Sequence, residues 1–572
     1  MLLVFLLLFT QASTQEDDPS PSVTLTHGGT VRGVRIRVDS TLQFEAFRDI
    51  PYGFTPFRFS PPIPYPGWPG VRNATQESVV CPQPPMFDPS LPLLGTEDCL
   101  VLQVFVPLTP SPPLPVMVYI HGGGFNRGSG RTDLYGPDHL LRHGIVLVNI
   151  NYRLGPFGFL STGDSAAAGN WGLMDQLEAL KWVQREIKAF GGDPSKVTLF
   201  GESAGGASVS FLQLSPLSTG LFHRAIAQSG SSLDVWSLTA RPKDKAVHLA
   251  ESLQCPDLTD SQAIVDCLRT KDAMDIVRAS VSDINDFHDD HPHRTFSVVV
   301  DGYILPGDPL ALLKSGRLGN PVPTITGRMD EEGLFLMPMA LMATDDQIKD
   351  INEHFLTRVC PRLLKLEEHR PADLPTVCRR IKEHFLGDDD IEITFQHARV
   401  LSHMIGERFF HIGHLKQLQQ LSKWVPTYHY IIDFVPETSY LKDVWLRLAG
   451  AKETEDKRHQ LELRWERNIP KGAGHGDDVG YLFSGTVFPQ PQANSPLAQM
   501  VQRMTELWTS FARHGNMDQV APEWKPWTVE EPATFVINNA PRISYTRTPN
   551  HLLVSWERLL EPPMEETCWA ED

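Results

Sequence analysis

Short, continuously apolar runs recur along the chain and alternate with segments of helical periodicity. The apolar runs cover residues 116–120, 145–150, 197–200, 225–228, 322–326 and 428–434. Runs without polar alternation are typical of parallel strands that are covered on both faces. Between them, residues 171–190 and 243–253 carry apolar positions at helical spacing. This alternation predicts an α/β fold with a large, mostly parallel central sheet flanked by helices.

The remaining segments extend this picture. Residues 22–38 alternate as short strands do, residues 100–106 form a further strand, and residues 51–95 are a Pro- and Gly-rich surface loop region. A helical pattern without strand signals runs from 340 to 424 and predicts a cap region. Further along the chain we expect a helix at 495–514 and a last strand at 533–538. Because neither repeat nor linker divides the chain, we expect one domain over residues 15–572.

The N-terminus has the pattern of a secretory signal. Residues 1–9 are apolar, small and polar residues follow, and the sequence turns acidic at 16–18, although no Lys or Arg precedes the apolar run. The pattern predicts a signal peptide at residues 1–14 and a secreted protein. The run is too short to span a bilayer and no later stretch is long enough, so we expect no membrane span. Asn73-Ala74-Thr75 is a candidate glycosylation site.

Composition excludes some partners. The 572 residues are 41% hydrophobic and carry a net charge of -18. Because no basic run stands out, we expect no nucleic-acid partner, which would need clustered Lys and Arg. The acidic balance serves solubility, or it favours cationic ligands.

Seven cysteines fit an oxidising compartment. By position, the candidate pairs are Cys81 with Cys99, Cys255 with Cys267, and Cys360 with Cys378. Cys568 is then left over, either free or linking two chains as a dimer. The residues alone leave the pairing and the oligomeric state open.

One motif stands at the end of the third run. Gly201-Glu202-Ser203-Ala204-Gly205 has the pattern of a nucleophile elbow, a sharp turn from strand to helix that exposes a serine. We expect the two glycines to take the strained dihedrals and to allow the close packing of such a turn. A helix starting near Ala204 would direct its free N–H groups toward the serine. The alternative interpretation is an ordinary glycine-rich turn.

A second glycine motif follows the first run. His121-Gly122-Gly123-Gly124-Phe125 stands directly after a predicted strand, where backbone N–H groups can turn inward without side chains in the way. Gly123 and Gly124, together with Ala204, are candidate donors for an oxyanion hole. The alternative is a loop that is rich in glycine for flexibility.

An acyl-transfer site also needs an acid and a base after the serine. Asp330, Glu331 and Glu332 follow the fifth run, and we favour Glu332, with the other two as fallbacks. His475 lies in a small-residue loop beyond the sixth run and is the candidate base. Glu202 would add negative potential beside the serine, or it is an exposed carboxylate of the turn.

Together these motifs resemble the type-B carboxylesterase/cholinesterase family. The resemblance rests on the elbow, the glycine loop and three further segments, at residues 97–102, 151–155 and 222–230. It implies an α/β-hydrolase fold, a triad of Ser203, Glu332 and His475, and an oxyanion hole of Gly123, Gly124 and Ala204. It also implies the disulfides Cys81–Cys99 and Cys255–Cys267, and a substrate gorge lined by Trp236 and Phe335.

The chain also departs from the family pattern. Cholinesterases carry a Trp in the first disulfide loop that holds quaternary ammonium, whereas residues 82–98 here contain only Phe87 as an aromatic. This argues against a choline site. Residues 477–483 are similar to arthropod members, some of which hydrolyse methyl esters of the juvenile-hormone type, although those tend to carry Gln at the position of Glu202. The segment before His475 is longer than the family pattern, with a polar insert near 440–470.

The sequence therefore predicts a secreted serine carboxylesterase that acts on small-molecule esters through an acyl-enzyme, without metal or organic cofactor. Histidines and aspartates at residues 287–293 suggest a metal site, but a solvated loop is the more ordinary interpretation. Two alternatives stay open. One is a juvenile-hormone or methyl-farnesoate esterase, and the other is an inactive adhesion protein on the same fold.

Overall fold

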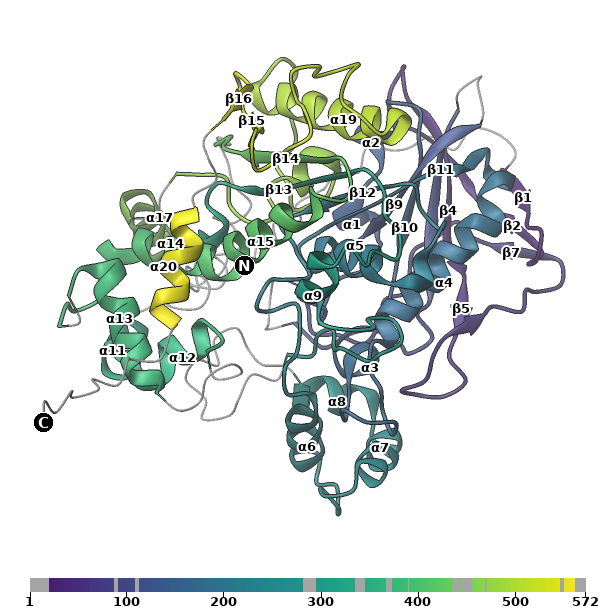
Figure 1. The fold of residues 1–572 in the computed structure, drawn as a ribbon. Coiled ribbons are helices and arrows are strands. Elements are labelled where there is room, and N and C mark those ends of the chain that lie inside the picture. The colour runs from purple at the N-terminus through teal and green to yellow at the C-terminus, as the bar shows by residue number, and fades with distance from the viewer. Residues whose placement is uncertain are drawn as a thin grey trace, which may run out of the picture.

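An eleven-stranded sheet organises the molecule (Figure 1). The computed structural model describes residues 20–86, 91–108, 113–280, 295–334, 345–366, 373–388, 390–435, 442, 446, 455–468, 471–545 and 550–560. From edge to edge the strands are β16 (Arg542–Ser544), β15 (Thr534–Ile537), β14 (Thr427–Ile432), β13 (Thr324–Met329), β12 (Arg224–Gln228), β11 (Gly192–Glu202), β9 (Leu114–Ile120), β10 (Val146–Ile150), β8 (Val101–Pro107), β4 (Gln43–Pro51) and β3 (Val34–Arg37).

The strands from β15 to β10 in this order are parallel, and the strands at both edges pair antiparallel. The predicted α/β class with a mostly parallel sheet is therefore confirmed. The sequence interpretation missed β4, because the alternation of polar and apolar residues breaks at Ala46-Phe47 and Arg48-Asp49, where the register with β8 shifts, and because the strand ends in Pro51. The predicted loop region 51–95 also contains short strands, β5 (Gly53–Phe54), β6 (Ile63–Pro64) and β7 (Val71–Asn73), the last in a small sheet with β1 (Ser22–Thr24) and β2 (Thr30–Arg32).

Two hydrophobic clusters cover the two faces of the sheet. Along β9, Val116, Val118 and Ile120 enter one cluster, while Met117 and Tyr119 enter the other. The first cluster includes apolar residues of α4 (Trp171–Glu186) and α5 (Ala204–Leu214), and the second those of α19 (Pro496–His514) and α2 (Asp138–Leu141). Figure 1 shows these helix pairs on opposite sides of the sheet. Burial on both faces explains why the strand sequences are continuously apolar.

Two groups of helices project from the sheet (Figure 1). One comprises α6 (Pro242–Ser252), α7 (Ser261–Thr270) and α8 (Ala273–Ser280). The other confirms the helical prediction for 340–424 where that segment is described, with α11 (Asp345–His354), η5 (Phe355–Val359), α12 (Cys360–Leu363), α13 (Leu374–Leu386), η6 (Phe395–His397), α14 (Ala398–Gly406), η7 (Glu407–His411) and α15 (Ile412–Leu421). Helix α17 (Glu455–Asn468) lies in the predicted polar insert and, with α20 (Asn550–Leu560), borders the second group.

The other short elements are α1 (Thr132–Tyr135), α3 (Gly155–Phe159), η1 (Ile187–Phe190), η2 (Pro216–Ser218), α9 (Pro309–Lys314), η4 (Glu332–Leu334) and α18 (Val479–Leu482). In the described part of the chain, no helix combines the length and apolar character that crossing a bilayer requires. The residues of the predicted signal peptide, Phe87, the loop 287–293, Phe335 and Cys568 lie outside the described residues.

In the described part of the chain, six cysteines form three disulfides, in the pairs that their positions suggested. Cys81–Cys99 closes the loop before β8, and Cys255–Cys267 links the end of α6 to α7. The third candidate pair, Cys360 with Cys378, is also bonded and joins α12 to α13. The first two agree with the pairing that the family resemblance implied.

Candidate active site

Ser203 occupies a strained turn between β11 and α5. Its φ and ψ are 57° and -121°, a combination that residues with a side chain rarely adopt. We expected the strained dihedrals at the flanking glycines, and this expectation was wrong, because neither has a positive φ. Gly201 and Gly205 serve close packing instead. A Cβ added to Gly205 would lie 1.9 Å from the Ile120 carbonyl oxygen, and one on Gly201 would lie 2.6 Å from it.

Three side chains from distant parts of the chain meet at this turn. His475 Nε2 lies 2.8 Å from Ser203 Oγ, and His475 Nδ1 lies 2.6 Å from Glu332 Oε2. The Met329 backbone N–H donates to the other Glu332 oxygen at 2.8 Å and fixes the carboxylate. Glu332 is fully buried and His475 nearly so. The arrangement is a continuous line of hydrogen bonds from hydroxyl to imidazole to carboxylate.

The neighbouring carboxylates point elsewhere. Glu331 contacts His403 Nε2 at 3.1 Å, and this hydrogen bond raises the pKa of His403. An isolated β-bridge joins the backbone of Glu331 to Gly474, beside His475. Asp330 is exposed. Of the three adjacent acids, Glu332 is therefore the one that is hydrogen-bonded to His475.

The glycine loop after β9 lies against the elbow. A Cβ on Gly122 would come within 3.1 Å of Ser203 Cβ, so only glycine allows this approach. Gly123 and Gly124 both have positive φ values, 104° and 61°. Ala204 is the first residue of α5, where an N–H has no partner within the helix. Gly122 thus contacts the elbow, Gly123 and Gly124 follow it in the loop, and Ala204 follows Ser203 in the chain.

A stacked pair supports the start of this loop. The His121 ring stacks on Tyr152 with 4.5 Å between ring centroids, and the Tyr152 hydroxyl donates to the His121 carbonyl at 3.0 Å. Burial lowers the pKa of His121 to about 4, so the ring is neutral at neutral pH. His121 Nδ1 lies 2.8 Å from the Gly122 carbonyl oxygen, within donor distance. His121 is thus a packed structural residue that shapes the glycine loop.

A second carboxylate faces His475. Glu202 Oε1 lies 3.2 Å from His475 Nε2, and burial raises the pKa of Glu202 to about 8. Burial by itself lowers the pKa of His475, but the carboxylates of Glu202 and Glu332 outweigh it and raise that pKa to about 9. The Glu202 carboxylate therefore favours the charged form of the His475 imidazole. The alternative of an exposed carboxylate at Glu202 was wrong, since its side chain is buried.

The sequence interpretation missed a polar chain behind His475. The Asp478 carboxylate accepts from Gln228 Nε2 at 2.7 Å, and Gln228 Oε1 accepts from Trp508 Nε1 at 3.0 Å. Burial raises the pKa of Asp478 to about 6. The available signal was the polar Gln228 at the end of a buried strand, a position that usually carries function in parallel sheets. Asp478 was visible only as part of the run after His475.

Aromatic side chains border the same region. Trp236, a predicted gorge residue, is partly buried and lies 6.1 Å from Phe125 and 6.0 Å from Phe410, measured between ring centroids. The Phe410 ring in turn lies 4.4 Å from the His475 ring. Phe410 was not predicted, because nothing in a helical pattern indicates which apolar residue reaches a distant loop. Among the described residues, no group of three or more His, Cys, Asp or Glu side chains is arranged to hold a metal ion.

Comparison with known proteins identifies the family. The model of the carboxylesterase family matches residues 19–553. The chain belongs to the carboxylesterase family. It is therefore a carboxylic ester hydrolase with an α/β-hydrolase fold, as the motifs implied.

Three relatives show the breadth of this carboxylesterase's similarity. The chain is 35% identical over 540 residues to the pyrethroid hydrolase Ces2e of Rattus norvegicus, which covers 91% of this chain and 86% of the relative. It is 33% identical over 520 residues to the juvenile hormone esterase of Tribolium castaneum, covering 87% and 84%. It is 38% identical over 367 residues to neuroligin-3 of Mus musculus, but the match covers 56% of this chain and 43% of the relative.

Proposed function

We propose that this carboxylesterase hydrolyses its esters through an acyl-enzyme on Ser203, with His475 as base and Glu332 as the orienting acid. The observation that carries the proposal is the pair of contacts on the two nitrogens of His475, 2.8 Å to Ser203 Oγ and 2.6 Å to Glu332. A base held between a hydroxyl and a buried carboxylate is the arrangement that activates a serine.

In the first half of the reaction, the Ser203 hydroxyl donates its proton to His475 Nε2 as Oγ attacks the ester carbonyl carbon. The imidazolium formed is stabilised by Glu332, which accepts from Nδ1–H and stays ionised. His475 then gives the proton to the alkoxide leaving group, so alcohol departs and the acyl group stays on Ser203. In the second half, water gives a proton to His475 and attacks the acyl carbon, which releases the acid and restores the serine.

The oxyanion of each tetrahedral intermediate needs fixed donors. Gly123, Gly124 and Ala204 supply backbone N–H groups, and their support is the position of the glycine loop against the elbow. Backbone donors are effective because they are already oriented before charge develops. Loss of one such donor in related chemistry costs roughly 3 to 4 kcal/mol of transition-state stabilisation.

The experiment is turnover of p-nitrophenyl acetate together with labelling by diethyl p-nitrophenyl phosphate. The wild-type chain should turn over the ester and take one diethylphosphoryl group on Ser203, located by peptide mass spectrometry. Ser203→Ala should lose both. A purified, folded wild-type chain that shows neither turnover nor label would overturn the proposal.

For the substrate, we propose a neutral ester rather than a choline ester. The support is the sequence of residues 82–98, which contains no Trp. Similarity to a juvenile hormone esterase makes a methyl sesquiterpenoate the second candidate. A panel of p-nitrophenyl esters of increasing acyl length, methyl farnesoate and butyrylthiocholine separates these classes. A far higher kcat/KM for butyrylthiocholine than for neutral esters would refute the choice.

The inactive adhesion alternative finds its support in the partial match to neuroligin-3. We rank it second, because this chain keeps the serine, acid and base at contact distance. The labelling experiment decides between the two, since an adhesion protein without an activated serine would take no phosphoryl group.

We also propose that residues 1–14 are a signal peptide and that residues 15–572 form one secreted domain. Three disulfides support an oxidising compartment, and Asn73 lies exposed on β7, where a glycan has room. Expression in a eukaryotic secretory host, N-terminal sequencing of the medium fraction and a mass shift with peptide N-glycosidase test this. Non-reducing electrophoresis of the wild type and Cys568→Ser tests for a dimer.

A further inference from the structure

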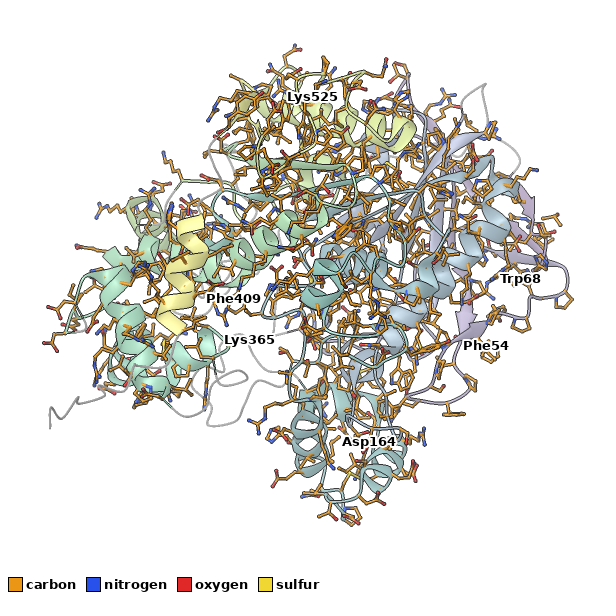
Figure 2. All side chains as sticks on the ribbon, viewed as in Figure 1. Phe54, Trp68, Asp164, Lys365, Phe409 and Lys525 are labelled. Atoms are coloured by element: carbon orange, nitrogen blue, oxygen red, sulfur yellow. A yellow bond between two sulfur atoms is a disulfide. The ribbon has the colours of Figure 1, made fainter. Side chains whose placement is uncertain are left out.

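Phe410 lies in an unusual helical segment. Residues Glu407–His411 form a π-helical turn, η7, between α14 and α15. Such turns are rare and are frequent at functional sites, because they displace a side chain from the regular helix surface and leave a backbone carbonyl free to bond elsewhere. Here the carbonyl of Phe409 (labelled in Figure 2) accepts from the Trp236 indole N–H at 3.0 Å.

The ring of Phe410 projects onto the face of His475. The two ring centroids lie 4.4 Å apart with an angle of 34° between the planes, and the Phe410 side chain is buried. The polar neighbours of Phe410 in η7 are engaged elsewhere. Glu407 accepts from the Trp556 indole at 2.8 Å, and Arg408 donates to the Leu364 carbonyl at 3.2 Å.

This contact supplies a constraint that the hydrogen bonds of His475 lack. Ser203 and Glu332 contact opposite nitrogens, so they fix two points of the imidazole. The ring remains able to tilt about the line that joins those points. A rigid aromatic ring against its face opposes that tilt, because it would have to be displaced from a close-packed interior.

Trp236 connects this contact to the glycine loop. Its ring lies 6.0 Å from Phe410 and 6.1 Å from Phe125, the residue directly after Gly124. Phe125 is itself fully buried against Phe159, 5.0 Å between centroids. One packed aromatic column thus runs from the end of the proposed oxyanion loop to the proposed base.

We propose that Phe410, anchored through Trp236, is a positioning residue that sets the tilt of the His475 ring toward Ser203. This inference rests on the proposed function, because it assigns Phe410 a role through His475. Displacements of about 1 Å in a reacting group reduce rates by roughly 100-fold, so a loosened ring should affect the chemical step rather than binding.

The test compares Phe410→Leu with the matched control Phe409→Leu. Phe409 is the adjacent ring, 6.3 Å from Phe410, and its described ring contact is with Phe410 rather than His475. Phe410→Leu should lower kcat about 10- to 100-fold and change KM by less than about twofold. Phe409→Leu should keep wild-type values. Trp236→Phe keeps an aromatic ring but removes the N–H donor, and it should lower kcat in the same direction.

A spectroscopic readout separates positioning from general destabilisation. The downfield proton resonance of His475 Nδ1–H, bonded to Glu332, should shift or broaden in Phe410→Leu and stay unchanged in Phe409→Leu. The two variants should have equal unfolding midpoints. If Phe410→Leu does not fold, Trp236→Phe carries the same test. The inference would be overturned if the folded variant, Phe410→Leu or Trp236→Phe, had the same kcat and the same His475 Nδ1–H resonance as Phe409→Leu. Absence of phosphoryl labelling in the wild type would instead refute the proposed function.

Discussion

At the scale of single residues, environment rather than residue type separates the acids around Ser203. Glu332 and Glu331 are adjacent and both buried, yet one contacts His475 and the other His403. Adjacent residues point in different directions here, so a single step along the chain decides which carboxylate faces the imidazole. Glu202, next to the serine, reaches the same imidazole from another side.

The acid assignment leads to a first prediction. Glu332→Gln should lower kcat by about 10⁴-fold, because an amide cannot stabilise the imidazolium as a carboxylate does. Glu331→Gln should retain most of the activity, since Glu331 bonds to His403 instead. Steady-state kinetics with p-nitrophenyl acetate measures both. The opposite result would move the acid to Glu331.

Glu202 leads to a second prediction, on pH dependence. The Glu202 carboxylate raises the pKa of His475, so Glu202→Gln should lower that pKa. Because the base acts in its neutral form, the acid limb of the kcat/KM profile should then move to lower pH. Profiles of wild type and Glu202→Gln from acid to alkaline pH measure the shift. A limb that moves to higher pH, or not at all, would contradict this electrostatic role.

At the scale of elements, the elbow depends on how closely α5 approaches the end of β9. The Ile120 carbonyl oxygen occupies the space where side chains of both elbow glycines would stand. The glycine loop begins at the same end of β9, so the elbow and the loop both pack at Ile120. Ser203 N–H also donates to the Gln228 carbonyl at 2.9 Å, which ties the turn to β12.

Gly205→Ala should therefore destabilise the fold. The added methyl group would meet backbone at 1.9 Å, and backbone inside a sheet cannot move aside, so we expect a loss of about 3 kcal/mol or more in the free energy of unfolding. Gly307→Ala is the matched control, because its nearest neighbour is a Leu312 side-chain atom at 3.8 Å. Urea unfolding followed by Trp fluorescence compares the two. Equal stability of both variants would contradict the packing argument.

At the scale of the whole molecule, buried ion pairs and hydrogen bonds connect segments that the sheet does not connect. Arg153, after β10, donates to both oxygens of Asp175 on α4 at 2.8 and 2.7 Å. The same guanidinium donates to the Ser60 carbonyl at 2.8 Å, so the N-terminal loop region is bonded to this pair as well. Both charged side chains are almost fully buried. The link holds a helix, a strand end and a long loop in one arrangement.

Asp175→Asn should be costly, because it leaves the Arg153 charge buried without a counter-charge. Breaking a buried pair in this way typically costs about 3 to 5 kcal/mol. The control is Glu462→Gln, which breaks the exposed pair with Arg458 on α17 and should cost about 0.5 kcal/mol or less. Urea unfolding midpoints measure both. Similar midpoints for the two variants would show that the buried pair contributes no more than a surface one.

Much of the fold and of the candidate site could be predicted, because short stretches of neighbouring residues indicate them. Continuous apolar runs predicted the parallel strands, and glycine motifs located the elbow and the loop beside it. Strand β4 was not predicted, since its polar and apolar residues stop alternating after Ala46 and no continuous apolar run replaces the alternation. Ser203, not its glycines, carries the backbone strain, because the glycines are needed for space rather than for unusual dihedrals.

By itself, the sequence determined the fold class, the family, the candidate nucleophile and the order of acid and base, because periodicity and short motifs are local. Only the tertiary structure decided which of three adjacent carboxylates faces His475, since that depends on how the segment after β13 pairs with the loop at Gly474. It also decided the place of Gln228, Asp478 and Phe410. Contacts between residues more than sixty positions apart arise from the packing of whole elements, and no local pattern records them.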